Sequence, residues 1–319
     1  MGILYILFFI FCCIALYYAG NLVLESLSVL GKFFHWKEFI VAFFIMALAA
    51  TLPNLFLAIA AVIDGVPELS LGDVIGGNVF DMTVAIALAV FFSKNGIDAK
   101  DKTIQTSLLF TFAAAVLPLI LLLDNKISRF DGILLLLLFL GYIYWLLSKK
   151  KRFKLMYSQH PIDDSGKKNS IGENILKTVV GITVLLIIAQ IIVNLASSFS
   201  KQFNIALPLV GILLVGLGNC LPETYFCIAA ARANKTNMIL GDIMGAVILP
   251  GTLVLGLVAL ISPFSVSNPS MFGAARYFLL IAALLFFICT KTDKKITKKE
   301  GILLLMVYFV FLLTEIFAK

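Results

Sequence analysis

Windows of about 20 apolar residues, each long enough to cross a bilayer as a helix, recur ten times along this 319-residue chain. Only 13% of the residues are charged, whereas a soluble domain carries about a quarter. We therefore predict an all-α polytopic membrane protein with ten transmembrane helices. The predicted spans are residues 3–30, 38–62, 71–92, 104–123, 130–148, 174–199, 207–232, 238–262, 272–290 and 301–317.

One hydrophilic segment, residues 149–173, separates five spans from the other five. It contains the basic run Lys149 to Arg152 and a turn-rich stretch from His160 to Gly166, which is typical of a solvated linker. The sequence therefore predicts a first five-helix repeat over residues 1–148, a basic linker over 149–173 and a second five-helix repeat over 174–319.

Basic residues predict the orientation in the membrane. Most of them lie in the loops that follow odd-numbered spans. On the other side, only Lys126, Arg129 and Lys201 lie in the loops after even-numbered spans, and Arg276 lies near the start of the ninth span. The positive-inside rule then places the linker in the cytoplasm and both termini outside, in the plasma membrane of the cell. Because the net charge of +7 is spread over loops and forms no single patch, nucleic acid is not an expected partner.

A segment of the first half, Leu48 to Asp81, recurs in the second half as Leu217 to Pro250, at a constant offset. The two segments align without a gap. The identical residues in the first segment are Leu48, Leu52, Pro53, Ile59, Ala60, Ala61, Leu71, Gly72, Asp73 and Gly76, and those in the second are Leu217, Leu221, Pro222, Ile228, Ala229, Ala230, Leu240, Gly241, Asp242 and Gly245. Five spans separate the two copies, so the second copy crosses the membrane in the opposite sense. This pattern predicts two inverted repeats, as in many secondary transporters.

Each copy contains a Leu-Pro pair inside an apolar helix. Pro53 and Pro222 have no backbone N–H, so each frees the carbonyl four residues earlier, that of Ala49 or Gly218. A freed carbonyl at membrane depth needs a partner, and a cation can be that partner. The alternative is a packing kink, but two prolines in inverted positions, each followed by Asn54 or Glu223, favour a site.

Acids without basic partners are the second indication of an ion site. Asp81 and Glu223 lie in apolar helices, where an acid costs roughly 2.5–3.5 kcal/mol at the helix centre. No Lys or Arg lies in these helices before Arg232. Paired carboxylates of this kind suit a divalent cation, or protons that neutralise them. Asn78 lies three residues before Asp81 and shares its helix face.

Two further acids, Asp73 and Asp242, are predicted in the first turn of their helices, where the helix dipole favours an acid. Helix capping and a role at the entrance for ions are both open for them. The spacings Gly72 to Gly76 and Gly241 to Gly245 predict that each acid-bearing helix approaches a neighbour closely.

These motifs resemble those of the cation/calcium exchanger superfamily, which includes sodium/calcium exchangers. Ala49–Asn54 and Gly218–Glu223 are similar to its Gly-Thr-Ser-x-Pro-Glu signature. Gly72–Asp81 and Gly241–Gly245 are similar to its Gly-Asn-x-x-Gly-Ser-Asn motif. The Asn-Val-Phe-Asp at 78–81 is similar to the Asn-Ile-Phe-Asp form of some potassium-dependent members. The ten-span plan extends the resemblance over nearly the whole chain.

The resemblance implies an ion site lined by Asn54, Asp81 and Glu223, completed by backbone oxygens near Ala50 and Asn219. The chain departs from the family pattern at several of these positions. Asn54 replaces the first glutamate, and Pro250 occupies the fourth central position. Family hydroxyl positions associated with sodium are here Ala50, Gly77, Ala246, Asn219 and Cys220, while Thr51 keeps its hydroxyl.

The function that follows is a secondary active antiporter, working as a monomer without a cofactor. It would exchange a divalent cation, with Ca²⁺ as first choice, for Na⁺ or H⁺ by alternating access. One alternative is a cation channel or a transport-inactive regulatory homologue, because the glutamate and hydroxyls are replaced. The other is an intramembrane aspartyl protease, suggested by Leu-Gly-Asp at 71–73 and 240–242. Those aspartates open helices that run in opposite senses, so they are not expected to meet as a dyad.

Overall fold

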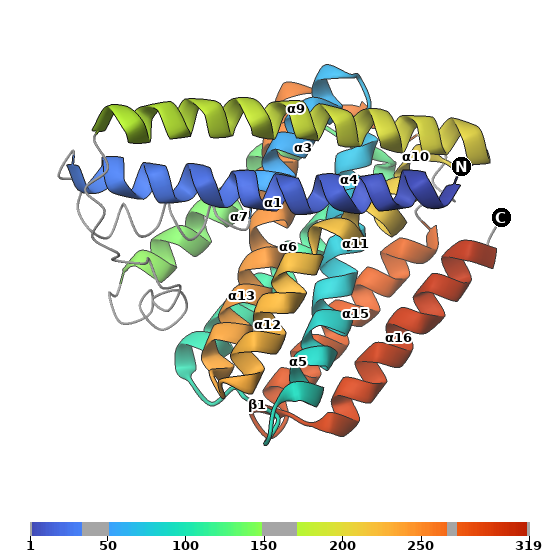
Figure 1. The fold of residues 1–319 in the computed structure, drawn as a ribbon. Coiled ribbons are helices and arrows are strands. Elements are labelled where there is room, and N and C mark those ends of the chain that lie inside the picture. The colour runs from blue at the N-terminus through green and yellow to red at the C-terminus, as the bar shows by residue number, and fades with distance from the viewer. Residues whose placement is uncertain (1, 34–50, 149–170, 267–272, 318–319) are drawn as a thin grey trace.

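The computed structural model describes residues 2–33, 51–148, 171–266 and 273–317 (Figure 1). Helices dominate it, which confirms the all-α membrane class. Within the described part of the chain, seven helices are long and apolar enough to cross a membrane. They are Glu68–Phe92, Lys102–Asp124, Arg129–Leu147, Gly172–Phe203, Leu207–Arg232, Thr236–Ile261 and Gly273–Lys291.

The elements of the first half follow one another in a simple order. They are α1 (Gly2–Phe33), α3 (Leu52–Ile63), α4 (Glu68–Phe80), the π-helical turn η1 (Asp81–Ala85), α5 (Ile86–Phe92), β1 (Ile97–Asp98), α6 (Lys102–Leu121), the 3-10 turn η2 (Leu122–Asp124), β2 (Lys126–Ile127) and α7 (Arg129–Leu147). Ala50, the first half of the predicted span 38–62 and most of the predicted linker lie outside the described residues.

The second half repeats this order. It contains α9 (Ile171–Phe203), α10 (Leu207–Val210), the π-helical turn η3 (Gly211–Val215), α11 (Gly216–Asn219), α12 (Leu221–Arg232), α13 (Thr236–Leu249), the π-helical turn η4 (Pro250–Val254), α14 (Leu255–Ile261), β3 (Phe264–Ser265), α15 (Gly273–Lys291), β4 (Lys295–Ile296) and α16 (Lys298–Phe317). Four pairs of elements are separated by the same number of residues as Pro53 and Pro222, at both their first and their last residue. The pairs are α3 and α12, η1 and η4, α5 and α14, and β2 and β4. The repeat seen in the sequence is therefore also a repeat of local structure.

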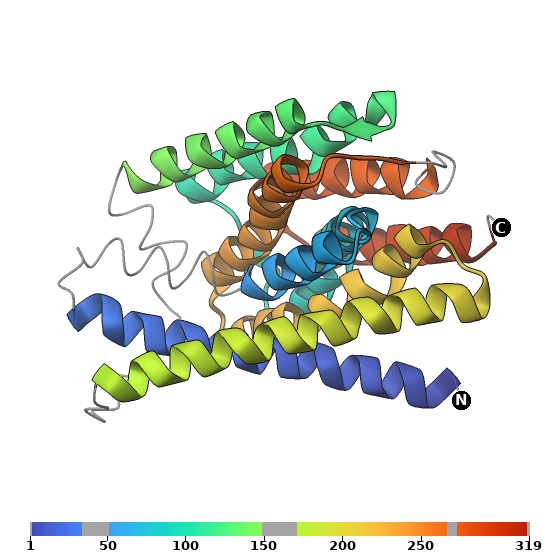
Figure 2. The ribbon, with the colours of Figure 1, turned by 90° about the horizontal axis from the view of Figure 1, so that it is seen from above.

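The two longest helices, α1 and α9, pack against each other and run across the other helices (Figure 1). Seen from above, they lie on one side of the molecule, and α6 and α7 lie on the opposite side (Figure 2). Buried Leu16 and Leu185 belong to one apolar cluster that also includes Leu57 of α3. Through this cluster the long pair packs against the rest of the protein.

Helices α4–α5 and α13–α14 form the centre of the fold. In each, 83% of an apolar 18-residue stretch is buried inside the protein, whereas the figure is 28–39% in the five other candidate spans. Close packing on α4 depends on glycine. A Cβ on Gly76 would overlap the carbonyl oxygen of Ile212, and one on Gly72 would overlap that of Pro208. This confirms the close approach predicted for Gly72 and Gly76.

Two short antiparallel ribbons connect the halves. Strand β1 pairs with β4, placing Ile97 opposite Ile296. Strand β2 pairs with β3, placing Ile127 opposite Phe264. Each ribbon therefore contains one strand from the first half and one from the second.

Candidate functional site

The helix that carries Asp81 changes its hydrogen-bonding pattern at that residue. The N–H of Ile86 bonds the carbonyl of Asp81, five residues earlier, which defines a π-helical turn. The N–H of Leu255 bonds the carbonyl of Pro250 in the same way. Such turns often occur at functional sites. The sequence analysis missed them, although their equivalent positions could have been inferred once one of them was known.

The Leu-Pro pair in the second half interrupts a helix, as predicted. Helix α11 ends at Asn219, Cys220 follows, and α12 begins at Leu221. Pro222 occupies the second helical position, where its missing N–H costs no hydrogen bond. Glu223 follows it in the first turn. In the first half, Thr51 likewise precedes α3, whose second and third residues are Pro53 and Asn54.

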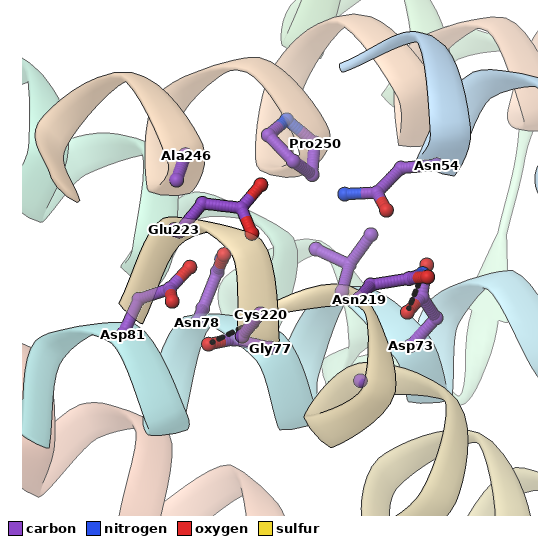
Figure 3. A pocket seen from close by; sticks show the side chains of 12 residues that line it. Asn54, Asp73, Gly77, Asn78, Asp81, Asn219, Cys220, Glu223, Ala246 and Pro250 are labelled. Carbon is purple, nitrogen blue, oxygen red and sulfur yellow. Dashed lines mark hydrogen bonds between the residues drawn. The ribbon is translucent and has the colours of Figure 1, made fainter. Parts of the chain in front are cut away.

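One pocket is lined by residues of these segments from both halves (Figure 3). Its lining consists of Asn54, Asp73, Val74, Gly77, Asn78, Asp81, Gly216, Asn219, Cys220, Glu223, Ala246 and Pro250. Most site residues predicted from the sequence are therefore brought together. Thr51 is fully buried but does not line the pocket, and Ala50 lies outside the described residues.

Asp81 and Glu223 enter the pocket from different halves of the chain. Only 3% of Asp81 is exposed. Its Oδ1 atom and the Oε2 atom of Glu223 are buried and have no hydrogen-bond partner. The pocket lining includes no Lys or Arg. Unpaired oxygens of this kind are costly in a protein interior, so a bound cation would stabilise the site.

Two predicted positions need correction. Asp73 and Asp242 do not lie in the first turns of their helices, because α4 already begins at Glu68 and α13 at Thr236. Helix capping therefore does not explain them. Asp73 is buried and lines the pocket, whereas Asp242 is not among the lining residues.

Each of these aspartates bonds one side chain from the α11–α12 region. Asn219 donates from Nδ2 to Oδ1 of Asp73 at 2.9 Å. The thiol of Cys227 donates to Oδ2 of Asp242 at 3.6 Å. The side chain of Asn219 thus fixes Asp73, a contact that joins the two halves. Cys220 similarly donates to the carbonyl oxygen of Gly77 at 3.6 Å.

The donor set of the pocket indicates the class of ion that it could hold. Among the described residues, no three His, Cys, Asp or Glu side chains form a group that could hold a metal. The pocket instead offers two unpaired carboxylates together with the side-chain amides of Asn54 and Asn78. Carboxylate and amide oxygens are the ligands of hard cations such as Ca²⁺ and Mg²⁺.

Comparison with known proteins agrees with this geometry. Residues 4–148 and 174–317 match the family model described as sodium/calcium exchanger protein. An uncharacterized membrane protein of Methanocaldococcus jannaschii is 27% identical over 97% of this chain and 97% of its own length.

Two solved structures share the fold. The sodium-calcium exchanger NCX_Mj, soaked with Na⁺ and Sr²⁺, is 24% identical, with a TM-score of 0.62 over 98% of this chain and 99% of its own. The H⁺/Ca²⁺ exchanger CAX is 16% identical, with a TM-score of 0.73 over 96% of this chain and 80% of its own.

Proposed function

Because this chain belongs to the sodium/calcium exchanger protein family, we propose that it exchanges a divalent cation, Ca²⁺ first, for Na⁺ or H⁺. Family membership makes it a membrane transporter and not an enzyme, which removes the aspartyl protease alternative. The ions are cargo and not resident cofactors.

One observation carries the proposal: two carboxylates from opposite halves line one pocket, and each has a buried oxygen without a hydrogen-bond partner. A divalent cation between Asp81 and Glu223 neutralises both charges and replaces the missing hydrogen bonds. Asn54 and Asn78 add neutral oxygens to the same site. Asn54 contributes no charge, so the pair of acids supplies the two negative charges that one divalent ion needs.

The counter-ion is the less constrained half of the exchange. Gly77 and Ala246 line the pocket without a hydroxyl, and Cys220 presents a thiol. Sodium therefore has fewer hard oxygen ligands here than the family pattern provides. Protons need no coordination shell, and the carboxylates of Asp81 and Glu223 are the groups that would accept them.

We further propose that the two halves form inverted five-helix repeats with ten transmembrane helices and operate by alternating access. The recurrence of elements at one constant offset supports this plan. The ribbon pairing also supports it, since a twofold axis would exchange β1–β4 with β2–β3. In this mechanism α1 and α9 slide across the core and expose the pocket to one side at a time.

Orientation and assembly complete the proposal. The excess of basic loops after odd-numbered spans supports a plasma-membrane protein with cytoplasmic residues 149–173 and both termini outside. Both halves that line the pocket belong to one chain, and we propose a monomer as the working unit.

Flux measurements in sealed vesicles test the proposal. Purified protein should take up Ca²⁺ only when a sodium or proton gradient runs the opposite way, and uptake should saturate. Uptake driven by a pH gradient without sodium identifies protons as counter-ion, and strict sodium dependence identifies sodium. Glu223→Gln should abolish uptake, whereas Glu173→Gln, at an exposed helix end, should retain it.

Other outcomes contradict the proposal separately. Calcium movement that needs no counter-ion would indicate a channel. Calcium binding without any movement would indicate a transport-inactive homologue. Full transport by Glu223→Gln would exclude the assigned pocket.

A further inference from the structure

The two ribbons that connect the halves have the same build but different charges. The segments around β1 and β4, residues 93–102 and 291–300, contain eight lysines and four acids. The segments around β2 and β3, residues 122–131 and 257–266, contain two basic residues and two acids. Only the β1–β4 ribbon therefore carries a net positive charge. Its eight lysines, called here the ribbon lysines, are Lys94, Lys100, Lys102, Lys291, Lys294, Lys295, Lys298 and Lys299.

The four acids in these segments do not neutralise the ribbon lysines. Asp98 pairs with Lys100 at 3.1 Å, and Lys100 is the only ribbon lysine in an ion pair within the described part of the chain. Asp101 and Glu300 instead accept backbone N–H groups next to the starts of α6 and α16, at 2.6 and 2.7 Å. Even with every acid ionised, half of the positive charge is left over.

The ribbon lysines project from a rigid support. The backbone N–H of Ala99 donates to the carbonyl oxygen of Lys294 at 2.8 Å, which continues the pairing of β1 with β4. The Nε2 atom of Gln105 donates to the carbonyl oxygens of Ala99 and Thr290, at 2.8 and 3.2 Å, and so connects the ribbon to α6 and α15. All the ribbon lysines except the half-buried Lys295 are exposed. Lysines of both halves are thus held on one surface, where their repulsion opposes the strand pairing.

The backbone at Lys294 is a second, independent indication that charge is required here. Its φ of 51° lies in the left-handed region, which glycine adopts easily and lysine rarely. The preceding residue, Asp293, has a φ of 52°, but aspartate tolerates this conformation better. Backbone strain of this kind is concentrated at functional positions. A glycine would relieve the strain at Lys294 but would remove the ammonium group.

Cations at this end of the molecule lie beside aromatic rings at helix ends. The guanidinium carbon of Arg232 is 4.7 Å from the centre of the Phe92 ring, and Nζ of Lys291 is 5.4 Å from that of the Phe287 ring. Phe92 is the last residue of α5 and is 43% exposed. Such pairs are typical of the membrane–water interface. Figure 1 shows β1 at the lower end of the helix bundle. The ribbon lysines therefore lie at the depth of lipid headgroups.

We propose that the ribbon lysines bind the headgroups of anionic phospholipids in the leaflet at this end, and that the bound phosphates hold the two halves together. A phosphate between lysines of the β1 and β4 segments replaces their mutual repulsion with attraction to a shared anion. A lipid is the occupant because anionic headgroups are concentrated at this depth. The inference goes beyond the proposed transport and holds for any cargo ion.

The test uses the full chain in lipid nanodiscs of phosphatidylcholine, alone or mixed with phosphatidylglycerol. Electron paramagnetic resonance of spin-labelled lipids measures binding, and a denaturant titration measures the unfolding midpoint. The wild type should bind phosphatidylglycerol about threefold or more tightly than phosphatidylcholine. It should also unfold at a higher denaturant concentration in the mixed discs. Added salt should weaken both effects.

Two variants that each lose three exposed positive charges separate the ribbon from the rest of the surface. The ribbon variant should lose most of the preference for phosphatidylglycerol. In pure phosphatidylcholine it should be at least as stable as the wild type, because repulsion across the ribbon is reduced. The control variant should keep both lipid effects. The ribbon variant combines Lys294→Gln, Lys298→Gln and Lys299→Gln, and the control variant combines Lys126→Gln, Arg129→Gln and Lys201→Gln.

Three results would overturn the inference. The first is a wild type that binds the two lipids equally or unfolds at the same midpoint in both kinds of disc. The second is an equal loss of lipid preference in the two variants, which would mean that only the total charge of the protein matters. The third is inorganic phosphate raising the midpoint in pure phosphatidylcholine as much as phosphatidylglycerol does, which would assign the lysines to a soluble anion. A failure of calcium transport would contradict the proposed function without changing these results.

Discussion

Thr83 and Thr252 take equivalent places in two π-helical turns, one in each half of the chain. The hydroxyl of Thr83 donates to the carbonyl oxygen of Val79, and that of Thr252 donates to the carbonyl oxygen of Ile248, both at 2.5 Å. Both side chains are fully buried. The two hydroxyls thus bond backbone oxygens immediately before the turns that begin at Asp81 and Pro250.

Thr83→Val is therefore expected to loosen the turn that positions Asp81. The valine keeps the shape of the side chain but loses the hydroxyl, which should cost about 1 kcal/mol of stability. The measurement is the unfolding midpoint in a denaturant titration of the solubilised protein. Thr183→Val is the control, because its hydroxyl makes the same kind of bond to Val179 on an exposed helix face. Equal effects of the two substitutions would contradict a special role for Thr83.

Asp81→Asn should have opposite effects on stability and on binding. Without ions, removing an unpartnered buried charge should stabilise the protein by about 1–3 kcal/mol. Divalent binding should weaken by about tenfold or more, because the ion loses one of its two charged ligands and the affinity of such sites depends on the number of charged ligands. Calorimetric titration with Ca²⁺ and an unfolding titration in chelator measure the two quantities.

Asp98→Asn is the control for Asp81. Asp98 forms an exposed pair with Lys100 at 3.1 Å, and such pairs contribute about 0–1 kcal/mol. Neither stability without ions nor calcium affinity should change measurably. A loss of stability in Asp81→Asn would show that its carboxylate is already satisfied within the protein.

Gly76→Ala tests the close contact between the two halves. Its new Cβ would overlap the backbone carbonyl of Ile212, which cannot move aside as a flexible side chain could. We expect a loss of about 1–3 kcal/mol in stability. Gly141→Ala, in α7, meets no atom within 4 Å and should stabilise its helix by up to about 1 kcal/mol. The opposite signs are the expected result of parallel unfolding titrations.

A contact between α9 and the end of α3 allows the proposed sliding motion to be blocked. Gln190 donates from Nε2 to Oδ2 of Asp64 at 2.5 Å. A reversible short thiol cross-linker between Gln190→Cys and Asp64→Cys should stop calcium exchange in vesicles, and a reductant should restore it. The single-cysteine variants treated with the same reagent are the controls. Undiminished exchange in the cross-linked protein would mean that α9 does not move relative to α3.

Much of the site was predictable because its signals are chemical. Apolar length predicted the helices, and the repeated Leu-Pro pairs with Asp81 and Glu223 predicted the residues that line the pocket. The predicted first residue of the helix that contains Asp73 was wrong. The apolar stretch begins at Leu71, whereas α4 begins with the polar residue Glu68. A helix can extend through polar residues where its first turn reaches the membrane surface.

The π-helical turns could not be predicted in the same way. In these turns a backbone N–H bonds the carbonyl five residues earlier. This depends on packing against neighbouring helices and leaves no pattern in the composition. Nor did periodicity reveal that Asn219 would bond Asp73, since the two residues are 146 positions apart. Such contacts become visible only when the halves are placed together.

The crossed ribbons β1–β4 and β2–β3 limit how this protein can change shape. Each ribbon joins a loop of one half to a loop of the other. The two halves therefore cannot separate by a hinge motion without breaking the strand pairing of both ribbons. In the proposed mechanism, the motion would come from parts that no ribbon joins, such as the long helices α1 and α9. If the proposed alternating access operates, the pocket would stay in place while α1 and α9 move across it and open it to one side of the membrane at a time.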